Sequence, residues 1–214
     1  MAVSDFMSQN LITVTPDAKI NEVLDLMKKN KINQIPVLEN KKLIGLITRR
    51  DIAAALPSPA TSLSVYEVNY LISKATIADV MQTTVPTIAP KAQLEAAIKM
   101  MRDQNISVLL VADQDQVEGI ITKNDIFDAF LQIAGYDLND SVFLRIKVVK
   151  DNKGIIAKLG EILAQNDFLI LNMVVVRHNQ EKILELHLKG SQVAELNQAL
   201  VAANFQIEEL RSNE

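Results

Sequence analysis

An internal repeat constrains the fold of this chain more than any other feature. When the chain is laid on itself with a shift of 74 residues, residues 45–52 (GLITRRDI) align without a gap with residues 119–126 (GIITKNDI). Identical residues recur at this offset outside that segment: Asp5 and Asp79, Met7 and Met81, Pro16 and Pro90, Met27 and Met101, Val37 and Val111. Self-similarity at a fixed offset indicates a duplicated supersecondary unit.

Both copies show the same order of local patterns. An extended segment (11–14 or 85–88) leads into a proline, and an amphipathic helix follows, at 19–30 in the first copy. Two short apolar runs, 34–38 and 43–47, are separated by a polar turn, which predicts a hairpin. A second helix follows Thr48. The predicted unit is β-α-β-β-α, and two such units can close a core that neither would bury alone.

The segment between the copies predicts a linker with a helix in it. Residues 57–62 are rich in Pro and Ser, which interrupt regular structure. Residues 64–74 then carry apolar side chains at helical spacing, at Val65, Val68, Leu71 and Ile72. We therefore expect a first domain at 1–62, a packing helix at 63–74 and a second domain at 75–134.

The repeat stops near Ser141, where a different pattern begins. Strands are predicted at 143–149, 169–177, 182–188 and 205–210, and helices at 153–165 and 191–203. Asn152 is the expected cap of the first helix, and the β-branched strand 169–177 is expected to be buried. The order βαββαβ is the ferredoxin-like plan, so the fold class is α+β with a third domain at 141–214. Residues 135–140 are the expected hinge.

Composition excludes several classes of function. A net charge of -4 and an aromatic content of 4% argue against nucleic-acid binding, which needs basic patches and stacking side chains. The chain has no cysteine, so disulfides and thiolate chemistry are absent. No window approaches the roughly 18 apolar residues of a membrane span, and the N-terminus lacks a leader pattern. We expect a cytoplasmic protein with no membrane association.

The motif Gly-h-h-Thr-x-x-Asp, where h is apolar, occurs once in each copy. At a strand-to-helix junction, main-chain N–H groups favour an anion, so Thr48 and Thr122 could contact a phosphate. Asp51 and Asp125, three residues on, could accept both hydroxyls of a ribose. The alternative is that each Thr is a helix cap and each Asp its partner in a capping box. Repetition alone does not choose between the two roles, which can coexist.

With these motifs, residues 4–133 resemble a tandem pair of cystathionine β-synthase (CBS) domains. The resemblance implies a compact disc with two related clefts that take adenine nucleotides or related adenosyl ligands. One cleft would combine the following residues: Thr122, Asp125, Ile32, Asn33 and the stretch near Ser4 and Met7. The other would combine their counterparts: Thr48, Asp51, Ile106, Ser107 and the stretch near Ala78 and Met81. Ile32 and Ile106 would sandwich the adenine.

The two clefts differ in the residues beside each Thr. Arg49 and Arg50 follow the first, whereas Lys123 and Asn124 follow the second, so phosphate binding should differ between them. A solvated helix start is the alternative reading of these basic residues. The second copy also has Leu110 where the first has Pro36, a departure that bears on its strand geometry.

Residues 141–211 resemble an ACT domain, a βαββαβ module that senses amino acids. The resemblance makes the turn Asp151-Asn152-Lys153-Gly154 a ligand candidate, carried by Asp151, Asn152 and Gly154; alternatively, Gly154 only eases the turn into the helix. His178 and His187 could be imagined as a metal pair, but packing is favoured and no metal is predicted. The methionines sit at core positions.

The order of modules resembles bacterial regulators of the acetoin-utilisation protein B type. We therefore expect a non-catalytic homodimer that senses AMP, ADP, ATP or S-adenosylmethionine between the repeats, and possible small metabolites at the third domain. Ligand binding would shift a conformational equilibrium that a protein target reads. One alternative is a ligand-independent dimerisation scaffold with vestigial clefts. Another is an enzyme, for which Asp51 and Asp125 are the only candidate bases.

Overall fold

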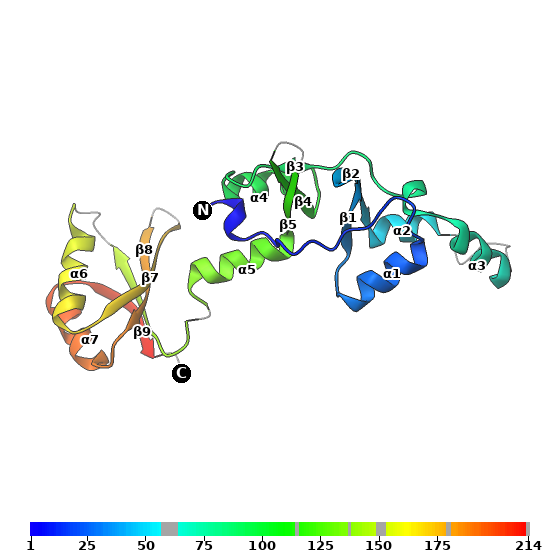
Figure 1. Ribbon diagram of the computed structural model, residues 1–214. Coiled ribbons are helices and arrows are strands. Elements are labelled where there is room, and N and C mark those ends of the chain that lie inside the picture. Colours follow the sequence, from blue (N-terminus) through cyan, green and yellow to red (C-terminus); the bar gives the residue numbers. More distant parts are fainter. Residues whose placement is uncertain (57–63, 114–115, 137, 149–152, 179–180, 213–214) are drawn as a thin grey trace. The chain divides into compact units, whose positions relative to one another are not determined.

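The computed structural model describes the chain except for residues 57–63, 114–115, 137, 149–152, 179–180 and 213–214. The chain forms two compact units, Met1–Phe127 and Asp128–Glu214 (Figure 1). The division falls inside a helix, whereas the sequence suggested a hinge at 135–140. The expected breaker segment at 57–62 lies outside the described residues.

The first unit contains both copies of the repeat. The elements of the first copy are α1 (Ile20–Lys29), β1 (Gln34–Glu39), β2 (Lys42–Thr48) and α2 (Arg49–Ala55). The elements of the second are β3 (Thr87–Ile88), α4 (Leu94–Asp103), β4 (Val108–Asp113), β5 (Gln116–Thr122) and α5 (Lys123–Ala134). Short 3₁₀ turns, η1 (Val3–Asp5) and η2 (Ile77–Asp79), precede the copies, and α3 (Val65–Lys74) lies between them. The predicted linker helix is therefore present.

The hairpins of the two copies share their irregularities. In the first, Asn40 and Lys41 both have positive φ angles, 50° and 66°, which suits a tight turn between twisted strands. Each hairpin carries a register shift at the same place, between Val37 and Leu38 in one and between Val111 and Ala112 in the other. Such bulges are inherited features of a strand pair. The duplication therefore extends to backbone detail.

The substitution of Pro36 by Leu110 changes one strand pairing. The Leu110 N–H donates to the Pro86 carbonyl oxygen at 3.1 Å, and β3 pairs with β4 in parallel. Proline has no N–H to donate, so the first copy retains only an isolated bridge between Val14 and Val37. Leu110 itself is fully buried. The departure therefore adds a strand to the second copy.

The segment that precedes each copy pairs with the other copy. Ser8 exchanges main-chain hydrogen bonds with Ile120, and Gln82 does the same with Leu46, all at 2.9–3.0 Å. The first residue of each Gly-h-h-Thr-x-x-Asp motif, Gly45 or Gly119, leaves room for these pairings between the copies. A Cβ on Gly45 would lie 2.6 Å from Met81 Sδ, and a Cβ on Gly119 would lie 2.6 Å from Met7 Sδ. The glycines therefore serve this close approach.

The core of the first copy also includes a residue from the segment before the second copy. It consists of apolar side chains from α1, β1, β2 and α2, with Ile77 added from the segment before the second copy: Ile20, Val23, Met27, Ile35, Val37, Ile47, Ile52 and Ile77. Ile72 of α3 packs against this core. The packing expected of Val65, Val68 and Leu71 lies outside the described side chains. Burial of these residues stabilises the two copies as one body.

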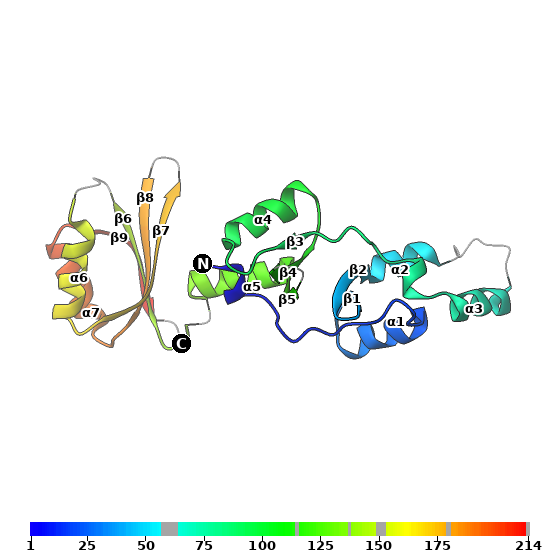
Figure 2. The ribbon, with the colours of Figure 1, turned by 45° about the horizontal axis from the view of Figure 1, so that its top comes forward.

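The second unit is the predicted βαββαβ domain. Its elements are β6 (Val142–Val148), α6 (Ile155–Gln165), β7 (Leu169–His178), β8 (Glu181–Lys189), α7 (Val193–Ala202) and β9 (Gln206–Ser212). The four strands are antiparallel in the order β7-β8-β6-β9, and both helices cover one face of the sheet (Figure 2). Alternate residues of β6 are buried beneath the helices, as the period of a strand requires.

Two local predictions in this unit were wrong. Helix α6 begins at Ile155, later than expected, and its N-cap is Gly154, with a φ of 92° and no side-chain cap, in place of Asn152. Strand β7 was expected to be buried, but its apolar residues are largely exposed. The reason is position: among the strands that the structure describes, β7 pairs with β8 alone and so lies at the edge of the sheet. β-branched composition fits both a central strand and an edge strand.

Candidate functional site

Two cavities in the first unit are related by the repeat. The first, of about 720 Å³, is lined by residues of both copies: Asn33, Gln34, Leu46, Thr48, Arg49, Arg50, Asp51, Ala53, Gln82, Pro86, Asn105, Ile106, Ser107 and Val108. The second, of about 320 Å³, is lined by Ser8, Asn10, Leu11, Ile12, Lys31, Ile32, Asn33, Gln34, Pro36, Ile120, Thr122, Asn124 and Asp125. Each cavity therefore holds one Thr-x-x-Asp motif together with the strand entry of the other copy.

Both motifs form capping boxes. The Asp51 N–H donates to Thr48 Oγ1 at 3.1 Å, while Asp51 Oδ2 accepts from the Thr48 N–H and hydroxyl at 2.9 and 2.6 Å. Thr122 and Asp125 make the same three bonds, at 3.4, 2.6 and 2.6 Å. The capping alternative is thus realised, and the hydroxyl proton of each Thr is committed to a carboxylate.

The first N–H groups of both helices are also engaged. The Arg49 N–H donates to the Asn33 carbonyl oxygen at 2.8 Å, and the Lys123 N–H donates to the Ser107 carbonyl oxygen at 3.1 Å. Helix α2 has only seven residues. The N–H groups of Arg49 and Lys123 are therefore already bonded within the protein, and the Arg49 and Arg50 side chains are the cationic groups that an anion in the first cavity would meet.

The two Asp carboxylates differ in their remaining oxygen. Gln82 Nε2 donates to Asp51 Oδ1 at 2.8 Å, so both oxygens of Asp51 have partners within the protein. The repeat equivalent of Gln82 is Ser8. Among the hydrogen bonds of the described residues, Asp125 is engaged through Oδ2 alone. The second cavity therefore offers a free acceptor oxygen that the first does not.

Charge differs between the cavities as the sequence suggested. Arg49 and Arg50 both line the first cavity. The second has Asn124 and Lys31, whereas Lys123 is not among its lining residues. Two guanidinium groups bind phosphate or carboxylate more strongly than one ammonium group because each can donate two parallel hydrogen bonds. The first cavity is the more suited to an anionic ligand.

Some residues taken from the resemblance do not line the cavities. Met7 and Met81 lie against the motif glycines, and neither they nor Ser4 and Ala78 are lining residues. The residues that follow the methionines, Ser8 and Gln82, take that place. Sequence reasoning missed them, together with Asn10, Leu11, Ile12, Pro86 and Asn105. The extended segment 11–14 was the available signal for part of this set.

A third cavity, of about 420 Å³, lies beside the ligand candidate of the second unit. Gly154 lines it, with Lys147, Lys153 and Lys158 nearby. Asp151 and Asn152 lie outside the described residues. No atom lies within 4 Å of a Cβ built on Gly154, so its φ of 92°, and not crowding, explains the glycine.

The two histidines lie on neighbouring strands of the second unit, as the sequence suggested. His187 lies across the ladder from Asn172, and His178 lies across from Glu181, at separate positions of the β7-β8 pair. Within the described part of the chain, no group of three metal-ligating side chains is found. His187 packs beside Phe143 and lies 3.3 Å from the Ser141 hydroxyl through Nδ1. Burial lowers the pKa of His187, and the positive charge of Arg211 lowers it further.

Comparison with known proteins accounts for the first unit. The CBS domain family matches residues 3–58 and 77–132, which is more than half of the chain. The protein belongs to the CBS-domain family. The two matched segments coincide with the two copies of the repeat, and each contains one Thr-x-x-Asp motif.

Similar proteins share the CBS pair with this chain. The CBS domain-containing protein YhcV of Bacillus subtilis is 30% identical over 125 residues, which span 58% of this chain and 82% of YhcV. A crystal structure of AcuB from Vibrio cholerae, assigned to acetoin utilization, is 28% identical with a TM-score of 0.53, over 62% of this chain and 91% of that one.

Two further solved structures of CBS proteins contain ligands. The CBS domain pair of protein MJ0100, in complex with 5′-methylthioadenosine and S-adenosyl-L-methionine, is 30% identical with a TM-score of 0.51, over 61% of this chain and 99% of that one. CBSX2 in complex with AMP is 27% identical with a TM-score of 0.53, over 62% of this chain and 97% of that one.

In the described part of this chain, no helix has the length and apolar character that a membrane crossing needs.

Proposed function

We propose that this protein is a non-catalytic sensor of an adenine nucleotide or a related adenosyl compound. The observation that carries the proposal is the pair of repeat-related cavities, each holding a Thr-x-x-Asp motif against the strand entry of the other copy. A ligand placed there touches both copies and would stabilise one arrangement of the unit over others. The AMP and S-adenosylmethionine complexes of related CBS proteins support this ligand class.

The first cavity supplies the groups that a nucleotide monophosphate needs. Arg49 and Arg50 bind the phosphate, Ile106 offers an apolar surface for the base, and Asp51, whose carboxylate is held by Thr48 and Gln82, lies on the ribose side. In the second cavity Asp125 and Ile32 have the corresponding roles, with Asn33 and Ser107 as polar neighbours of the two bases. Because of its arginines, the first cavity favours AMP, ADP or ATP, whereas the second favours a ligand with less negative charge.

The finer parts of the proposal concern the rest of the chain. The second unit is an ACT-type module that senses an amino acid or small metabolite near Gly154, and the protein is a cytoplasmic homodimer whose protein target acts in acetoin or central carbon metabolism. The AcuB likeness supports the metabolic link. The alternative is a ligand-independent scaffold with vestigial cavities, which Asp51 favours because its carboxylate is already saturated within the protein.

Calorimetric titration with AMP, ADP, ATP and S-adenosylmethionine tests the proposal. We expect binding by the wild type, and a loss of at least tenfold in affinity in an Arg49→Ala, Arg50→Ala, Asp125→Asn variant. The matched control is Asp79→Asn, because Asp79 forms the same capping box with Thr76 but lines neither cavity. The control should bind as the wild type does. No binding of any of the four ligands by the wild type would establish the scaffold.

A further inference from the structure

A row of three side chains crosses the sheet of the second unit on the face that the helices leave uncovered. His187 of β8 and Arg211 of β9 both lie opposite Phe143 of β6. Val142 and Leu144, the neighbours of Phe143, are buried in the core beneath the helices, so Phe143 faces the other side. The imidazole packs on Phe143 at 5.3 Å between ring centroids, and the guanidinium carbon of Arg211 lies 5.1 Å from the Phe143 centroid. Two polar groups therefore flank one aromatic ring.

A cavity of about 560 Å³ opens on this row. It is lined by the three side chains of the row and by the segment that follows α5, including Tyr136 and Leu138. All of its lining residues belong to the second unit. The cavity beside Gly154 is a different one, because Gly154 follows the opposite, C-terminal end of β6. The second unit therefore has two separate cavities, and the one over the row has no role in the function proposed above.

Hydrogen bonds attach the wall of this cavity to the sheet. Asn172 Nδ2 of β7 donates to the Ile133 carbonyl oxygen at 2.7 Å, at the end of α5. The Ser141 hydroxyl, just before β6, donates to the Leu138 carbonyl oxygen at 2.7 Å, and the Leu138 N–H donates to the Gly135 carbonyl oxygen at 3.2 Å. These bonds hold the segment on both sides of its cavity-lining residues. The cavity is therefore preformed, as small-molecule sites usually are.

The hydrogen bonds of Ser141 define what His187 offers to a ligand. A hydroxyl has one proton, and Ser141 gives it to the Leu138 carbonyl oxygen, so in the 3.3 Å contact with Ser141 Oγ the Nδ1 of His187 is the donor. Burial lowers the pKa of His187, Arg211 lowers it further and Glu185 raises it; the net lowering keeps the ring neutral at pH 7.5. A neutral imidazole that donates through Nδ1 accepts through Nε2. This end of the site therefore suits a ligand hydroxyl.

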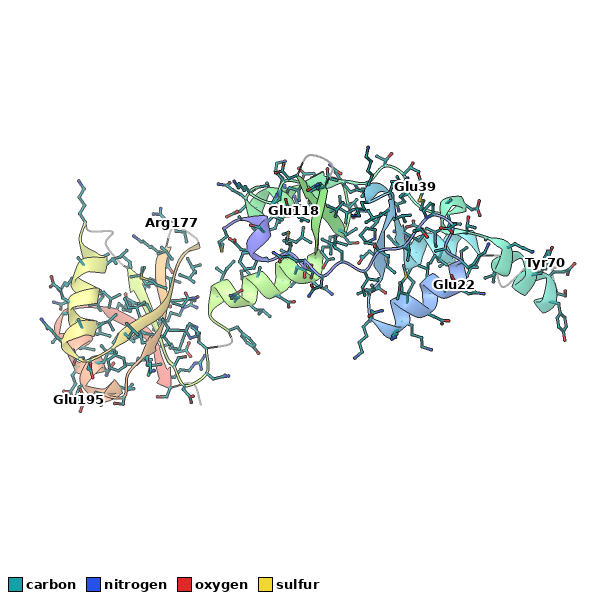
Figure 3. The ribbon with its side chains drawn as sticks, in the orientation of Figure 1. Glu22, Glu39, Tyr70, Glu118, Arg177 and Glu195 are labelled. Carbon is teal, nitrogen blue, oxygen red and sulfur yellow. The ribbon has the colours of Figure 1, made fainter. Side chains whose placement is uncertain are left out.

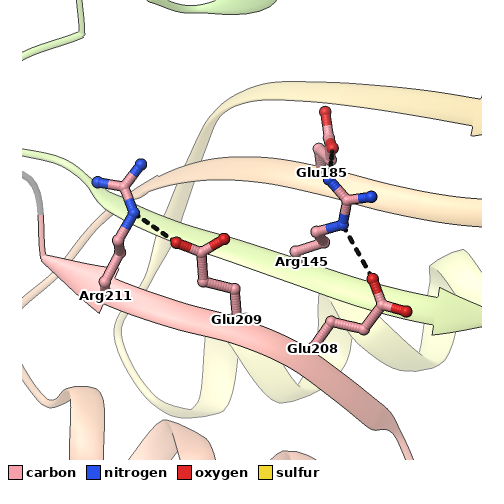
Figure 4. Close-up of polar contacts among 5 residues, drawn as sticks. All are labelled: Arg145, Glu185, Glu208, Glu209 and Arg211. Carbon is pink, nitrogen blue, oxygen red and sulfur yellow. Dashed lines mark hydrogen bonds and ion pairs between the residues drawn. The ribbon is translucent and has the colours of Figure 1, made fainter.

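Arg211 supplies positive charge at the other end of the row. Its Nε donates to Glu209 Oε1 at 2.7 Å (Figure 4), which uses one of the five N–H donors of the guanidinium. One guanidinium of this sheet already pairs with two carboxylates, because Arg145 contacts Glu185 at 2.6 Å and Glu208 at 2.9 Å. Arg211 can therefore bind the carboxylate of a ligand beside Glu209.

We propose that this cavity binds a small carboxylic acid that has an apolar body and a hydroxyl group at the end away from the carboxylate. The carboxylate pairs with Arg211, the body packs over Phe143, and the hydroxyl donates to His187 Nε2. Neighbouring strands lie about 4.8 Å apart, so β8 and β9, on either side of β6, are separated by roughly 10 Å. Once both side chains take up part of that span, a body the size of one benzene ring fits between them. The site is independent of adenosyl sensing, because neither cavity of the first unit contributes to it.

Calorimetric titration of the full chain with 4-hydroxybenzoate at pH 7.5 tests the charged end of the site. We expect binding by the wild type and at least tenfold weaker binding by Arg211→Gln. The matched control is Arg177→Gln, which should bind as the wild type does, because Arg177 lies near the C-terminal end of β7 (Figure 3) and does not line the cavity. Circular dichroism checks that the variants fold. No binding by the wild type, or equal affinity in Arg211→Gln, would overturn the proposal.

Two related probes test the site in the wild type alone. Benzoate lacks the hydroxyl and should bind two- to tenfold more weakly than 4-hydroxybenzoate, whereas in His187→Phe the two acids should bind equally. 4-Hydroxybenzyl alcohol lacks the carboxylate and should bind at least tenfold more weakly than 4-hydroxybenzoate. If the wild type binds benzoate as tightly as 4-hydroxybenzoate, the role given to His187 is wrong.

Nuclear magnetic resonance locates the ligand directly. The chain has two histidines, so the carbon-bound protons of the imidazoles give two sets of signals, which His178→Gln assigns. Addition of 4-hydroxybenzoate should shift the signals of His187 and leave those of His178 in place. A shift of neither ring, or of His178 as much as His187, would refute binding at this cavity.

Discussion

Gln82 is the residue at which the two cavities of the first unit differ most in their hydrogen bonding. Its side-chain amide occupies Asp51 Oδ1, while its main chain pairs with Leu46 of the other copy. At the equivalent position Ser8 keeps the main-chain pairing with Ile120, but within the described part of the chain no hydrogen bond joins its side chain to Asp125. The main-chain pairing between copies is thus common to both cavities. They differ in the side chain at the paired position, which is Ser8 in one and Gln82 in the other.

A Gln82→Ser variant tests this role. It frees Asp51 Oδ1 to accept from a ribose hydroxyl, and a net hydrogen bond contributes roughly 0.5–1.5 kcal/mol, so we expect AMP affinity at the first cavity to rise about two- to tenfold. Titration with 2′,3′-dideoxy-AMP should show no gain, because that ligand lacks the hydroxyls. Gln104→Ser, at the end of α4, is the control for loss of a glutamine. Equal gains in affinity for AMP and 2′,3′-dideoxy-AMP would show that Gln82 does not limit hydrogen bonding of Asp51 to the ribose hydroxyls.

At the scale of elements, His187 on β8 lies near the N-terminal end of β6 and the C-terminal end of β9. Its ring packs on Phe143 at 5.3 Å between centroids, and a Cβ on Gly135, which follows α5 with a φ of 76°, would lie 2.9 Å from His187 Cδ2. The charged groups that act on this imidazole are Arg211 from β9 and Glu185 from β8; burial and Arg211 lower its pKa, and Glu185 opposes them. The folded unit therefore favours the neutral ring.

This preference makes the stability of the second unit depend on pH. Because the folded pKa lies below the unfolded value, the contribution of His187 is complete above that unfolded value, near 6.5. It is lost as pH falls through the folded pKa. Urea unfolding at pH 7.5 and at pH 5 should show a drop in the free energy of unfolding that His187→Gln reduces. The control variant His178→Gln, which changes the other histidine, should keep the full drop. If the drop survives in His187→Gln, groups other than His187 cause the pH dependence.

For the whole molecule, two compact units predict two unfolding transitions. Each unit has its own core, one built from the repeat and the other between α6, α7 and the sheet. A ligand stabilises only the unit that binds it, by on the order of 2.7 kcal/mol at one hundred times its dissociation constant. Differential scanning calorimetry with AMP should raise the transition of the first unit and leave that of the second in place. A common upward shift would show that the units unfold as one.

The sequence determined the features that depend on nearby residues. The duplication, the two hairpins, the capping boxes at Thr48 and Thr122, and the βαββαβ order could all be predicted, because turn residues, caps and hydrophobic period act over a few positions. The chemistry of the two cavities could be predicted only in part, since the motif residues lie there but Gln82 and Ser8, which complete the two linings, come in each case from the other copy.

Tertiary structure alone decided which residues met across long stretches of chain. The exchange of the segments before each copy brought Ser8 and Gln82 to the cavities and turned Met7 and Met81 toward Gly119 and Gly45. In the second unit, the strand order of the sheet placed β7 at its edge, where apolar residues remain exposed. The physical reason is the same in both cases: strand order and segment exchange are set by packing between distant residues, and local patterns of hydrophobicity are equally compatible with several such arrangements.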